Sequence, residues 1–264
     1  MKKALICGVS GQDGAYLAGL LLGKDYLVYG SSRDILGTNF GNLSLLGIKD
    51  KVELVSVDLT DFRSVLRVVD QIQPDEIYNL AGLTSVSLSF QQPVEAMQSI
   101  AGSTLNLLEV IRFINLGIRF YNAGSSDCFG DTGACAATER TPFNPCSPYA
   151  VAKSTAHFLV NNYRMAYGLY ACTGILFNHE SPLRPTRFVT QKIVSTAARI
   201  AKGSDERLSL GNLAIARDWG WAPDYVDAMW RMLQLDQAED FVVATGKAIS
   251  LEDFACKTFA TFDL

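Results

Sequence analysis

The alternation of short apolar segments with longer helical ones is the feature that most restricts how this chain can fold. The apolar segments are rich in β-branched and aromatic residues, and the segments between them repeat apolar residues with a helical period. Strands that are each followed by a helix are typical of a parallel sheet covered on both faces, so the sequence predicts a doubly wound α/β fold. The predicted strands are KALICGV, YLVYGSS, VELVSVD, EIYNLAG, RFYNAGS and YACTGILF, and the predicted helices are Ala15–Lys24, Asp61–Gln73, Val94–Leu116 and Ser147–Tyr167.

The rhythm changes after residue 178, which predicts a large first unit over residues 1–178 and a smaller one over residues 179–264. Pro182 and Pro185 favour a rigid crossing between them. Because the chain stops soon after its last helix begins, we expect the second unit to be incomplete and partly interleaved with the first. Its expected elements are a helix Phe188–Lys202, a strand RLSLG, a loop NLAIARDWGWA, a helix Pro223–Leu235, a strand DFVVATG and a helix capped by Ser250 with Asp253.

Charge and composition exclude several classes of function. With 48% hydrophobic and 19% charged residues the chain is typical of a globular protein, and its net charge of −4 disfavours nucleic acid and anionic membranes as partners. Two histidines and six cysteines without a Cys-x-x-Cys pair predict no metal site. Several cysteines lie in apolar runs, which favours buried thiols and a cytoplasmic location.

A glycine-rich turn, GVSGQDG, directly follows the first predicted strand and opens the first helix. Gly8, Gly11 and Gly14 suit a tight turn and the close approach of the backbone to a diphosphate. The helix N-terminus offers N–H groups and partial positive charge to a diphosphate. In this context of strand, turn and helix, the spacing predicts a Rossmann-like dinucleotide site in the first unit, with Gln12 and Asp13 also at the cofactor.

The end of the second predicted strand indicates which dinucleotide binds. An NAD site places an acid there for the ribose 2′-hydroxyl, whereas this chain has Ser31, Ser32 and Arg33. Hydroxyls and a guanidinium suit a 2′-phosphate, so we expect NADP rather than NAD. The alternative is a surface arginine paired with Asp34.

Two further strand ends are candidates for cofactor contacts. Asp58, with Leu59 beside it, suits an adenine amino group, although Asp58 could equally cap the next helix. Leu80 and Ala81, in NLAG, bring small residues to a place where backbone passes close to a cofactor, although a plain turn explains them nearly as well.

Tyr149 and Lys153 lie one helical turn apart in SPYAVAK, on the helix after the fifth predicted strand. Tyrosine has a pKa of about 10, and a lysine or a cofactor cation beside it favours the phenolate that a base requires. Because ligands bind at the carboxyl ends of parallel strands, Ser125, Ser126 and Asp127 are expected at the same crevice.

Polar residues also follow the sixth predicted strand, in FNHESPLR, and recur in ARDWGW. Asn178 suits ligand recognition, and Arg217 offers the forked donors that match a diphosphate. Lys192 is a candidate contact to a nucleotide base, although a solvated helix face is as good an explanation. A lone histidine such as His179 is more often structural, and Arg217 with Asp218 could be a surface cluster.

Together these motifs resemble the extended short-chain dehydrogenase/reductase superfamily, and GILFNHESPLR and RDWGWAPDYVDAMW resemble its GDP-mannose 4,6-dehydratases in particular. The resemblance runs from about residue 4 to the end of the chain, and the family usually continues further. It implies catalysis by Ser125, Asp127, Tyr149 and Lys153 and cofactor contacts from His179 and Arg184, in addition to the cofactor residues above. The implied substrate-binding residues are Thr84, Ser126, Asn178, Lys192 and Arg217.

The resemblance implies redox-neutral dehydration of GDP-mannose with bound NADP, by a homo-oligomer that is a dimer or a tetramer. The chain departs from the family at two positions. Asp127 replaces a glutamate that is one methylene longer, and a misplacement of that size can cost about 10²-fold in rate. Cys146 stands where the family has arginine. The alternatives are a sugar-nucleotide 4-reductase or 4-epimerase, which needs no acid at 127, and a non-catalytic NADP-binding regulator.

Overall fold

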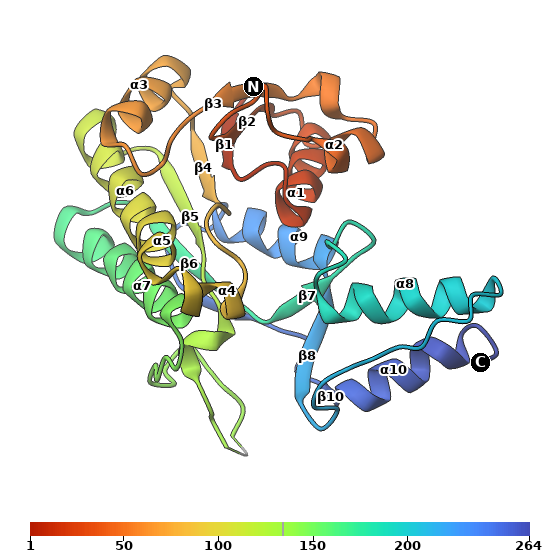
Figure 1. Ribbon diagram of the computed structural model, residues 1–264. Helices are drawn as coiled ribbons and strands as arrows, with labels where there is room; N and C mark the ends of the chain where they lie inside the picture. The colour runs from red at the N-terminus through yellow and green to blue at the C-terminus, as the bar shows by residue number, and fades with distance from the viewer. Residues whose placement is uncertain (134) are drawn as a thin grey trace.

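A seven-stranded parallel sheet forms the centre of the molecule (Figure 1). The computed structural model describes residues 1–133 and 135–264. The strands of this sheet are β1 (Lys3–Cys7), β2 (Leu27–Ser32), β3 (Glu53–Ser56), β4 (Glu76–Asn79), β5 (Arg119–Ala123), β6 (Ala171–Leu176) and β9 (Phe241–Val243). They lie in the order β3-β2-β1-β4-β5-β6-β9, and all neighbouring strands are parallel. The predicted Rossmann-like α/β fold is confirmed.

Helices cover both faces of this sheet, and each face has its own apolar core (Figure 1). Neighbouring residues of a strand enter opposite cores, so Leu5 packs on one face and Ile6 on the other, and both are fully buried. This explains why the strand segments are apolar throughout instead of alternating. One face carries α1 (Gln12–Leu22), α2 (Gly41–Leu45) and α9 (Ala222–Met232); the other carries α3 (Phe62–Ile72), α6 (Ser103–Ile114) and α7 (Pro148–Tyr167).

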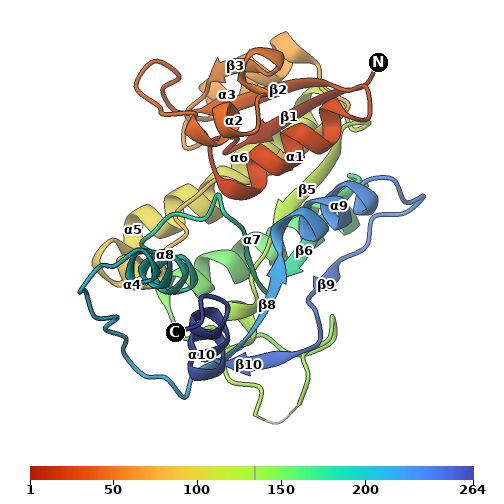
Figure 2. The same ribbon diagram turned by 90° about the vertical axis from the view of Figure 1, so that its right-hand side faces the viewer.

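A small second sheet lies beside the first and belongs to the later part of the chain (Figure 2). Its order is β10-β8-β7, with β7 parallel and β10 antiparallel to β8. Two helices of this part pack against each other. Ser250 caps the second of them, because its hydroxyl accepts a hydrogen bond from the Asp253 N–H at 3.0 Å, as the capping pair predicted. These elements are β7 (Asn178–Glu180), α8 (Val189–Ala201), β8 (Ala216–Trp221), β10 (Ala248–Ser250) and α10 (Leu251–Ala260).

Two elements of the later part return to the first unit. Strand β9 pairs with β6 at the edge of the large sheet, and α9 packs against α1. The chain therefore crosses between the units more than once, and the crossing segment 181–188 lies where they meet. None of the helices in residues 1–133 and 135–264 is both long and apolar enough to span a membrane.

One predicted strand is wrong. Residues 207–211, RLSLG, form no strand, and β8 instead occupies residues that were predicted to be a loop. Contacts from distant parts of the chain stabilise β8: Trp219 packs on Phe254 with ring centroids 5.2 Å apart, and the Asp218 carboxylate accepts the Gly246 N–H at 2.8 Å. A local pattern of residue types does not contain these contacts.

The helix predicted over Val94–Leu116 is confirmed as one continuous helical run from Pro93 to Ile114. It consists of α5 (Pro93–Ala96), the π-helical segment Met97–Gly102 and α6, and a π-helical distortion is frequent near functional sites. A short helix, α4 (Val86–Gln91), precedes it, and the 3₁₀ helices are Lys49–Lys51 and Ser126–Phe129.

The strand order locates the ligand site. From β1 the chain continues outward through β2 to β3, and from β4 it continues in the opposite direction through β5 to β6. The reversal between β1 and β4 opens a crevice at the carboxyl ends of the strands, where ligands bind in doubly wound folds.

Candidate active site

The glycine-rich turn between β1 and α1 has the close packing that a dinucleotide site requires. Gly8 has φ of +86°, and a Cβ added there would lie 3.1 Å from the backbone of Ala81. A Cβ on Gly14 would lie 2.4 Å from the Gly8 carbonyl oxygen, and the Gly11 N–H donates to the same oxygen at 3.1 Å. Glycine is therefore required, and the turn presents the start of α1 to the crevice, which fits a diphosphate.

A first cavity, the Arg33 cavity, encloses about 500 Å³ beside this turn. Arg33 extends from the end of β2, and its guanidinium lies 3.6 Å from the Glu95 carboxylate of α5 across the cavity. Ser31 and Ser32 also line it. Of the predicted cofactor-binding residues, Gly8, Gly11, Arg33, Asp58, Leu59, Leu80 and Ala81 line this cavity.

Asp58 faces the Arg33 cavity and does not cap the following helix. Its carboxylate accepts hydrogen bonds from the Thr60 N–H at 3.0 Å and the Thr60 hydroxyl at 2.7 Å, and these bonds lower the pKa of Asp58. Asp61 is the residue that caps α3, through the Arg63 N–H. The alternative of a helix-capping Asp58 is therefore wrong, while its role toward adenine stays a prediction.

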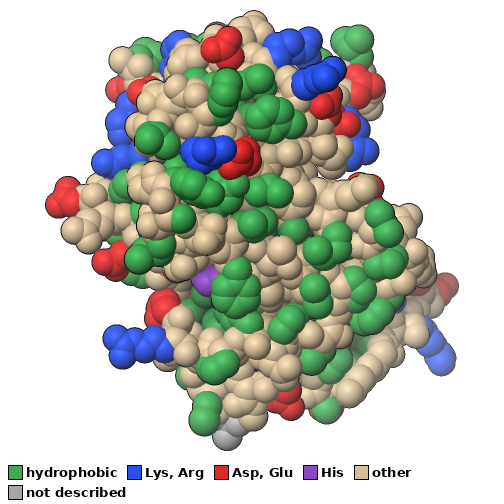
Figure 3. All heavy atoms as spheres, turned by 90° about the vertical axis from the view of Figure 1, so that its left-hand side faces the viewer, with side chains coloured by type: hydrophobic (Ala, Val, Ile, Leu, Met, Phe, Trp, Pro, Cys, Tyr) green, Lys and Arg blue, Asp and Glu red, His purple; other side chains and the backbone are tan. Residues whose placement is uncertain are grey.

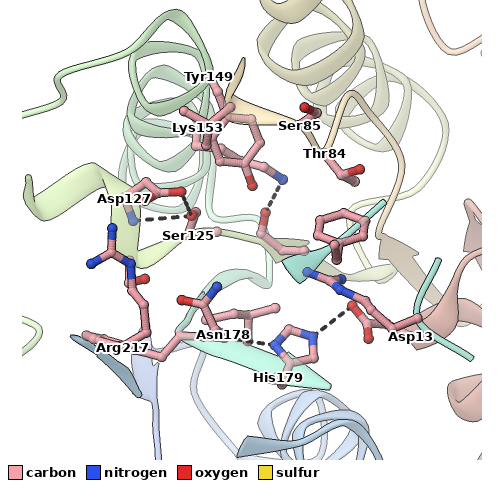
Figure 4. Close-up of a pocket in the computed structure, with 18 of the residues that line it drawn as sticks. Asp13, Thr84, Ser85, Ser125, Asp127, Tyr149, Lys153, Asn178, His179 and Arg217 are labelled. Atoms are coloured by element: carbon pink, nitrogen blue, oxygen red, sulfur yellow. Dashed lines mark hydrogen bonds and ion pairs between the residues drawn. The ribbon is translucent and has the colours of Figure 1, made fainter. Parts of the chain in front are cut away.

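A second cavity, the Tyr149 cavity, encloses about 590 Å³ where β5 and β6 end and β7 begins (Figure 4). It assembles side chains from the start of α1, the loop after β4, the 3₁₀ turn after β5, the start of α7, β7 with the crossing that follows it, and β8. Residues from six separate parts of the sequence thus face one space. Of the predicted residues, Asp13, Leu80, Thr84, Ser125, Ser126, Asp127, Tyr149, Lys153, Asn178, His179, Arg184 and Arg217 line it.

Tyr149 and Lys153 are held at the first turns of α7. The Ser147 hydroxyl caps this helix by accepting the Ala150 N–H at 3.1 Å, and Pro148 occupies the first helical position. The Lys153 ammonium donates to the Ala123 carbonyl at 2.7 Å and lies 5.9 Å from the centre of the Tyr149 ring. Both side chains face the cavity (Figure 4).

In the protein alone, burial opposes the phenolate form of Tyr149, and the expected role of Lys153 and a cofactor cation stays a prediction. Burial raises the pKa of the Tyr149 phenol far above its ordinary value; Ser125 lowers it and the Asp127 charge raises it. Burial also lowers the pKa of Lys153 to about 8. The lysine is one turn away, but its ammonium is bonded to the main-chain carbonyl of Ala123. A cofactor cation beside Tyr149 would favour the phenolate.

Ser125 and Asp127 lie opposite Tyr149, in the turn that follows β5 (Figure 4). The Ser125 oxygen accepts the Asp127 N–H at 3.2 Å, and its hydroxyl lies 3.4 Å from the Asp127 carboxylate. Ser125 is buried, whereas the Asp127 side chain is exposed to the cavity. The carboxylate is thus free to meet a ligand while the serine is fixed near the phenol.

His179 joins β7 to the glycine-rich turn. Its Nε2 lies 2.9 Å from the Asp13 carboxylate and its Nδ1 lies 2.8 Å from the Phe177 carbonyl. Both partners are acceptors, so both ring nitrogens carry protons and the imidazole is a cation. Burial alone would lower the pKa of His179, but the Asp13 charge outweighs it and the net shift is upward. The Tyr225 ring stacks on the imidazole at 4.3 Å.

Three of the predicted binding residues, Gln12, Arg184 and Lys192, make contacts to other parts of the protein. The Gln12 amide donates to the His179 carbonyl at 3.2 Å and accepts the Ser181 hydroxyl at 2.7 Å, so it also ties α1 to the crossing. Arg184 pairs with Glu180 at 3.3 Å while lining the Tyr149 cavity. Lys192 lines neither cavity, and its ammonium donates to the Ser209 carbonyl at 2.6 Å.

Sequence reasoning missed two charged residues at these cavities. Arg187, in the crossing, lines both cavities, and Glu95 pairs with Arg33 in the Arg33 cavity. Neither belongs to a recognisable motif. Each meets a partner far away in the sequence, so residue spacing alone gives no signal for either.

Solved structures of enzymes that act on sugar nucleotides have the same fold. A dTDP-glucose 4,6-dehydratase from Bacillus anthracis, in complex with NAD, matches with a TM-score of 0.86 and 18% identity, over 100% of this chain and 81% of that one. A UDP-glucose 4-epimerase from Thermotoga maritima matches with a TM-score of 0.87 and 19% identity, over 99% and 82%.

Closer relatives define the family. The family model described as GDP-mannose 4,6 dehydratase matches residues 5–264. The chain is 48% identical to a GDP-mannose 4,6-dehydratase of Yersinia enterocolitica, over 96% of this chain and 70% of that protein. It is 46% identical to GDP-mannose 4,6 dehydratase 2 of Arabidopsis thaliana, over 100% and 73%. The chain belongs to the GDP-mannose 4,6-dehydratase family.

Proposed function

We propose that this protein converts GDP-mannose to GDP-4-keto-6-deoxymannose and water, with NADP as a cofactor that is reduced and reoxidised in each cycle. The observation that carries the proposal is one cavity that holds a carboxylate, Asp127, beside Ser125, Tyr149 and Lys153. Reduction or epimerisation at C4 needs the latter three residues only. Removal of water needs an additional acid–base group, and Asp127 is exposed in the place where it can serve.

In the proposed reaction, Tyr149 takes the proton of the sugar C4 hydroxyl while Ser125 donates a hydrogen bond to the same oxygen. The resulting 4-ketone makes the C5 proton acidic, and Asp127 takes this proton and transfers it to the C6 hydroxyl, which leaves as water. When bound, NADP would accept a hydride from C4, return it to C6, and add positive charge beside Tyr149. Reprotonation of C5 balances the proton that Tyr149 removed.

The residues around the two cavities suit NADP. The glycine-rich turn leaves no room for a side chain at Gly8 or Gly14, and the Arg33 cavity opens directly beside it. Arg33 has Ser31 and Ser32 behind it and no carboxylate at the end of β2. Its pair with Glu95 is long and exposed, so a 2′-phosphate can displace Glu95 at small cost. Arg217 at the Tyr149 cavity suits the diphosphate of the sugar nucleotide.

Arg33→Ala is expected to remove most of the preference for NADP over NAD. A guanidinium that binds a phosphate contributes a charge-assisted hydrogen bond, so NADP affinity should fall about ten- to a hundredfold while NAD affinity is nearly unchanged. Dissociation constants for both cofactors, measured by quenching of protein fluorescence, test this. Arg67→Ala, on the exposed face of α3 outside both cavities, is the matched control. Equal affinities of the wild type for NAD and NADP would contradict the assignment.

We also propose that the protein is a homo-oligomer, a dimer or a tetramer. Hydrophobic side chains are spread over the face that α6 and α7 form (Figure 3), and an exposed apolar face of this kind marks a protein interface. Leu105 and Phe113 of α6 and Phe158 and Met165 of α7 are exposed there. Sedimentation velocity measures the assembly directly, and a monomer at micromolar concentration would contradict this proposal.

The function is tested by incubating the protein with GDP-mannose and NADP and following the alkaline absorbance of a 4-keto sugar. Dehydration predicts that the 4-keto product accumulates without net formation of NADPH, since each hydride taken from C4 returns to C6. Net consumption of added NADPH would point to a reductase instead. Inversion of configuration at C4 without loss of water would point to an epimerase. A protein that binds the cofactor but converts no sugar nucleotide would point to a regulator.

A further inference from the structure

The two cavities meet at a passage whose walls come from different parts of the chain. Leu80, at the end of β4, and Thr84, in the loop that follows, line both cavities from one side. Arg187, from the crossing after β7, lines both cavities from the other side. Its guanidinium lies 3.5 Å from the Thr84 hydroxyl, so the two residues meet over the passage.

In the part of the chain that the structure describes, Arg187 is not paired with a carboxylate, unlike His179 and Arg184, the two other basic side chains on β7 and the crossing that line the Tyr149 cavity. His179 is paired with Asp13 at 2.9 Å, and Arg184 with Glu180 at 3.3 Å, so these four side chains form neutral pairs. Within residues 1–133 and 135–264, no carboxylate lies within ion-pairing distance of Arg187. A guanidinium has five donors, and the single long contact to Thr84 leaves nearly all of them available to an anion.

The position of the passage indicates which anion this is. A dinucleotide with its 2′-phosphate at Arg33 and its nicotinamide near Tyr149 would extend through both cavities, so its diphosphate would be held where they adjoin. One side of that region is the glycine-rich turn, whose Gly8 and Gly11 line the Arg33 cavity. The other side is Arg187. The diphosphate of a sugar nucleotide, by contrast, would bind Arg217, because Arg217 lines the Tyr149 cavity and not the Arg33 cavity.

We propose that Arg187 is a clasp on the cofactor: its guanidinium binds the cofactor diphosphate at the passage between the two cavities and must release it before the cofactor can leave. This rests on the proposed use of a dinucleotide and adds a binding residue to it. The segment that leads to Arg187 is held to α1 by two contacts, Ser181 with Gln12 and His179 with Asp13. The backbone that carries the clasp is therefore fixed relative to the glycine-rich turn. A redox-neutral cycle benefits, because the cofactor that is reduced in one step must remain for the next.

Arg187→Gln tests the clasp because it removes the charge and the fork while keeping a polar side chain at an exposed position. We expect NADPH to dissociate about ten- to a hundredfold faster from Arg187→Gln than from the wild type, which is the loss of one charged hydrogen bond. Dissociation is measured by stopped-flow fluorescence after mixing the NADPH complex with excess NADP. Arg187→Lys keeps the positive charge but loses the forked donors of the guanidinium. Its NADPH dissociation rate should lie between those of the wild type and Arg187→Gln. Arg67→Gln makes the same change of charge outside both cavities and should match the wild type.

A second measurement separates the cofactor from the sugar nucleotide as the source of the diphosphate. Calorimetric titration of GDP into the protein saturated with NADP should give the same affinity for the wild type and Arg187→Gln. Unchanged NADPH dissociation in Arg187→Gln overturns the clasp, and reduced GDP affinity with unchanged cofactor binding assigns Arg187 to the substrate instead. If the wild type fails to dehydrate GDP-mannose but NADPH dissociation still depends on Arg187, the clasp stands and the proposed reaction fails.

Discussion

Tyr149→Phe is expected to lower kcat for GDP-mannose dehydration by about 10²- to 10⁴-fold while leaving the affinities for NADP and GDP nearly unchanged. The substitution removes the group that takes the C4 proton and little else. The ring keeps its packing against Ile100, Ala152 and Ala156, and the backbone N–H at 149 keeps its bond to the Ser89 hydroxyl at 3.1 Å. Steady-state assay of the 4-keto product, with binding titrations for both ligands, measures the two effects separately.

Tyr167→Phe, at the other end of the same helix, is the matched control for this experiment. Its ring is half exposed and packs on Tyr163 with centroids 4.9 Å apart, outside both cavities, so loss of the hydroxyl should not change turnover. Near-normal turnover in Tyr149→Phe would show that another group takes the C4 proton. An equal loss in both variants would indicate a general effect on α7.

The parts of the site that lie in single segments were predictable from the sequence. The glycine-rich turn, the Ser125–Asp127 turn and the Tyr149–Lys153 pair each follow directly from a strand or a helix start that local periodicity defines. Parallel strands place their carboxyl ends at one edge, so the prediction that these segments share a crevice needed only the alternation of strands and helices. The structure places all of these segments at the two adjoining cavities.

The parts that depend on distant pairing were not predictable. Strand β8 forms because it pairs with β7 and β10, and the residues 207–211 that looked more like a strand have no such partners. Arg187 meets Thr84, 103 residues earlier, and neither position belongs to a common motif. The direction of the Tyr149 pKa shift depends on burial, which the four-residue spacing to Lys153 does not reveal.

In the proposed reaction Asp127 distinguishes a dehydratase from its relatives, because reduction or epimerisation at C4 needs only Ser125, Tyr149 and Lys153. The family resemblance implies a glutamate at this position, whose side chain is one methylene longer. The Asp127 side chain is exposed to a cavity of about 590 Å³, which leaves space for a longer side chain. The test of the C5 base is therefore a pair of substitutions, one that removes the carboxylate and one that lengthens it.

Asp127→Asn is expected to lower dehydration by about 10²- to 10⁴-fold and to abolish exchange of the C5 proton with solvent, because an amide cannot accept that proton. Oxidation at C4 should persist and appear as NADPH absorbance in a single turnover, since Tyr149 and Ser125 are unchanged. Asp127→Glu should retain or raise activity. Asp131→Asn, whose Oδ1 can keep the hydrogen bond from the Gly133 N–H at 2.8 Å, is the control outside both cavities. Full dehydration by Asp127→Asn would show that another group takes the C5 proton, and C4 oxidation without dehydration in the wild type would favour the epimerase or reductase.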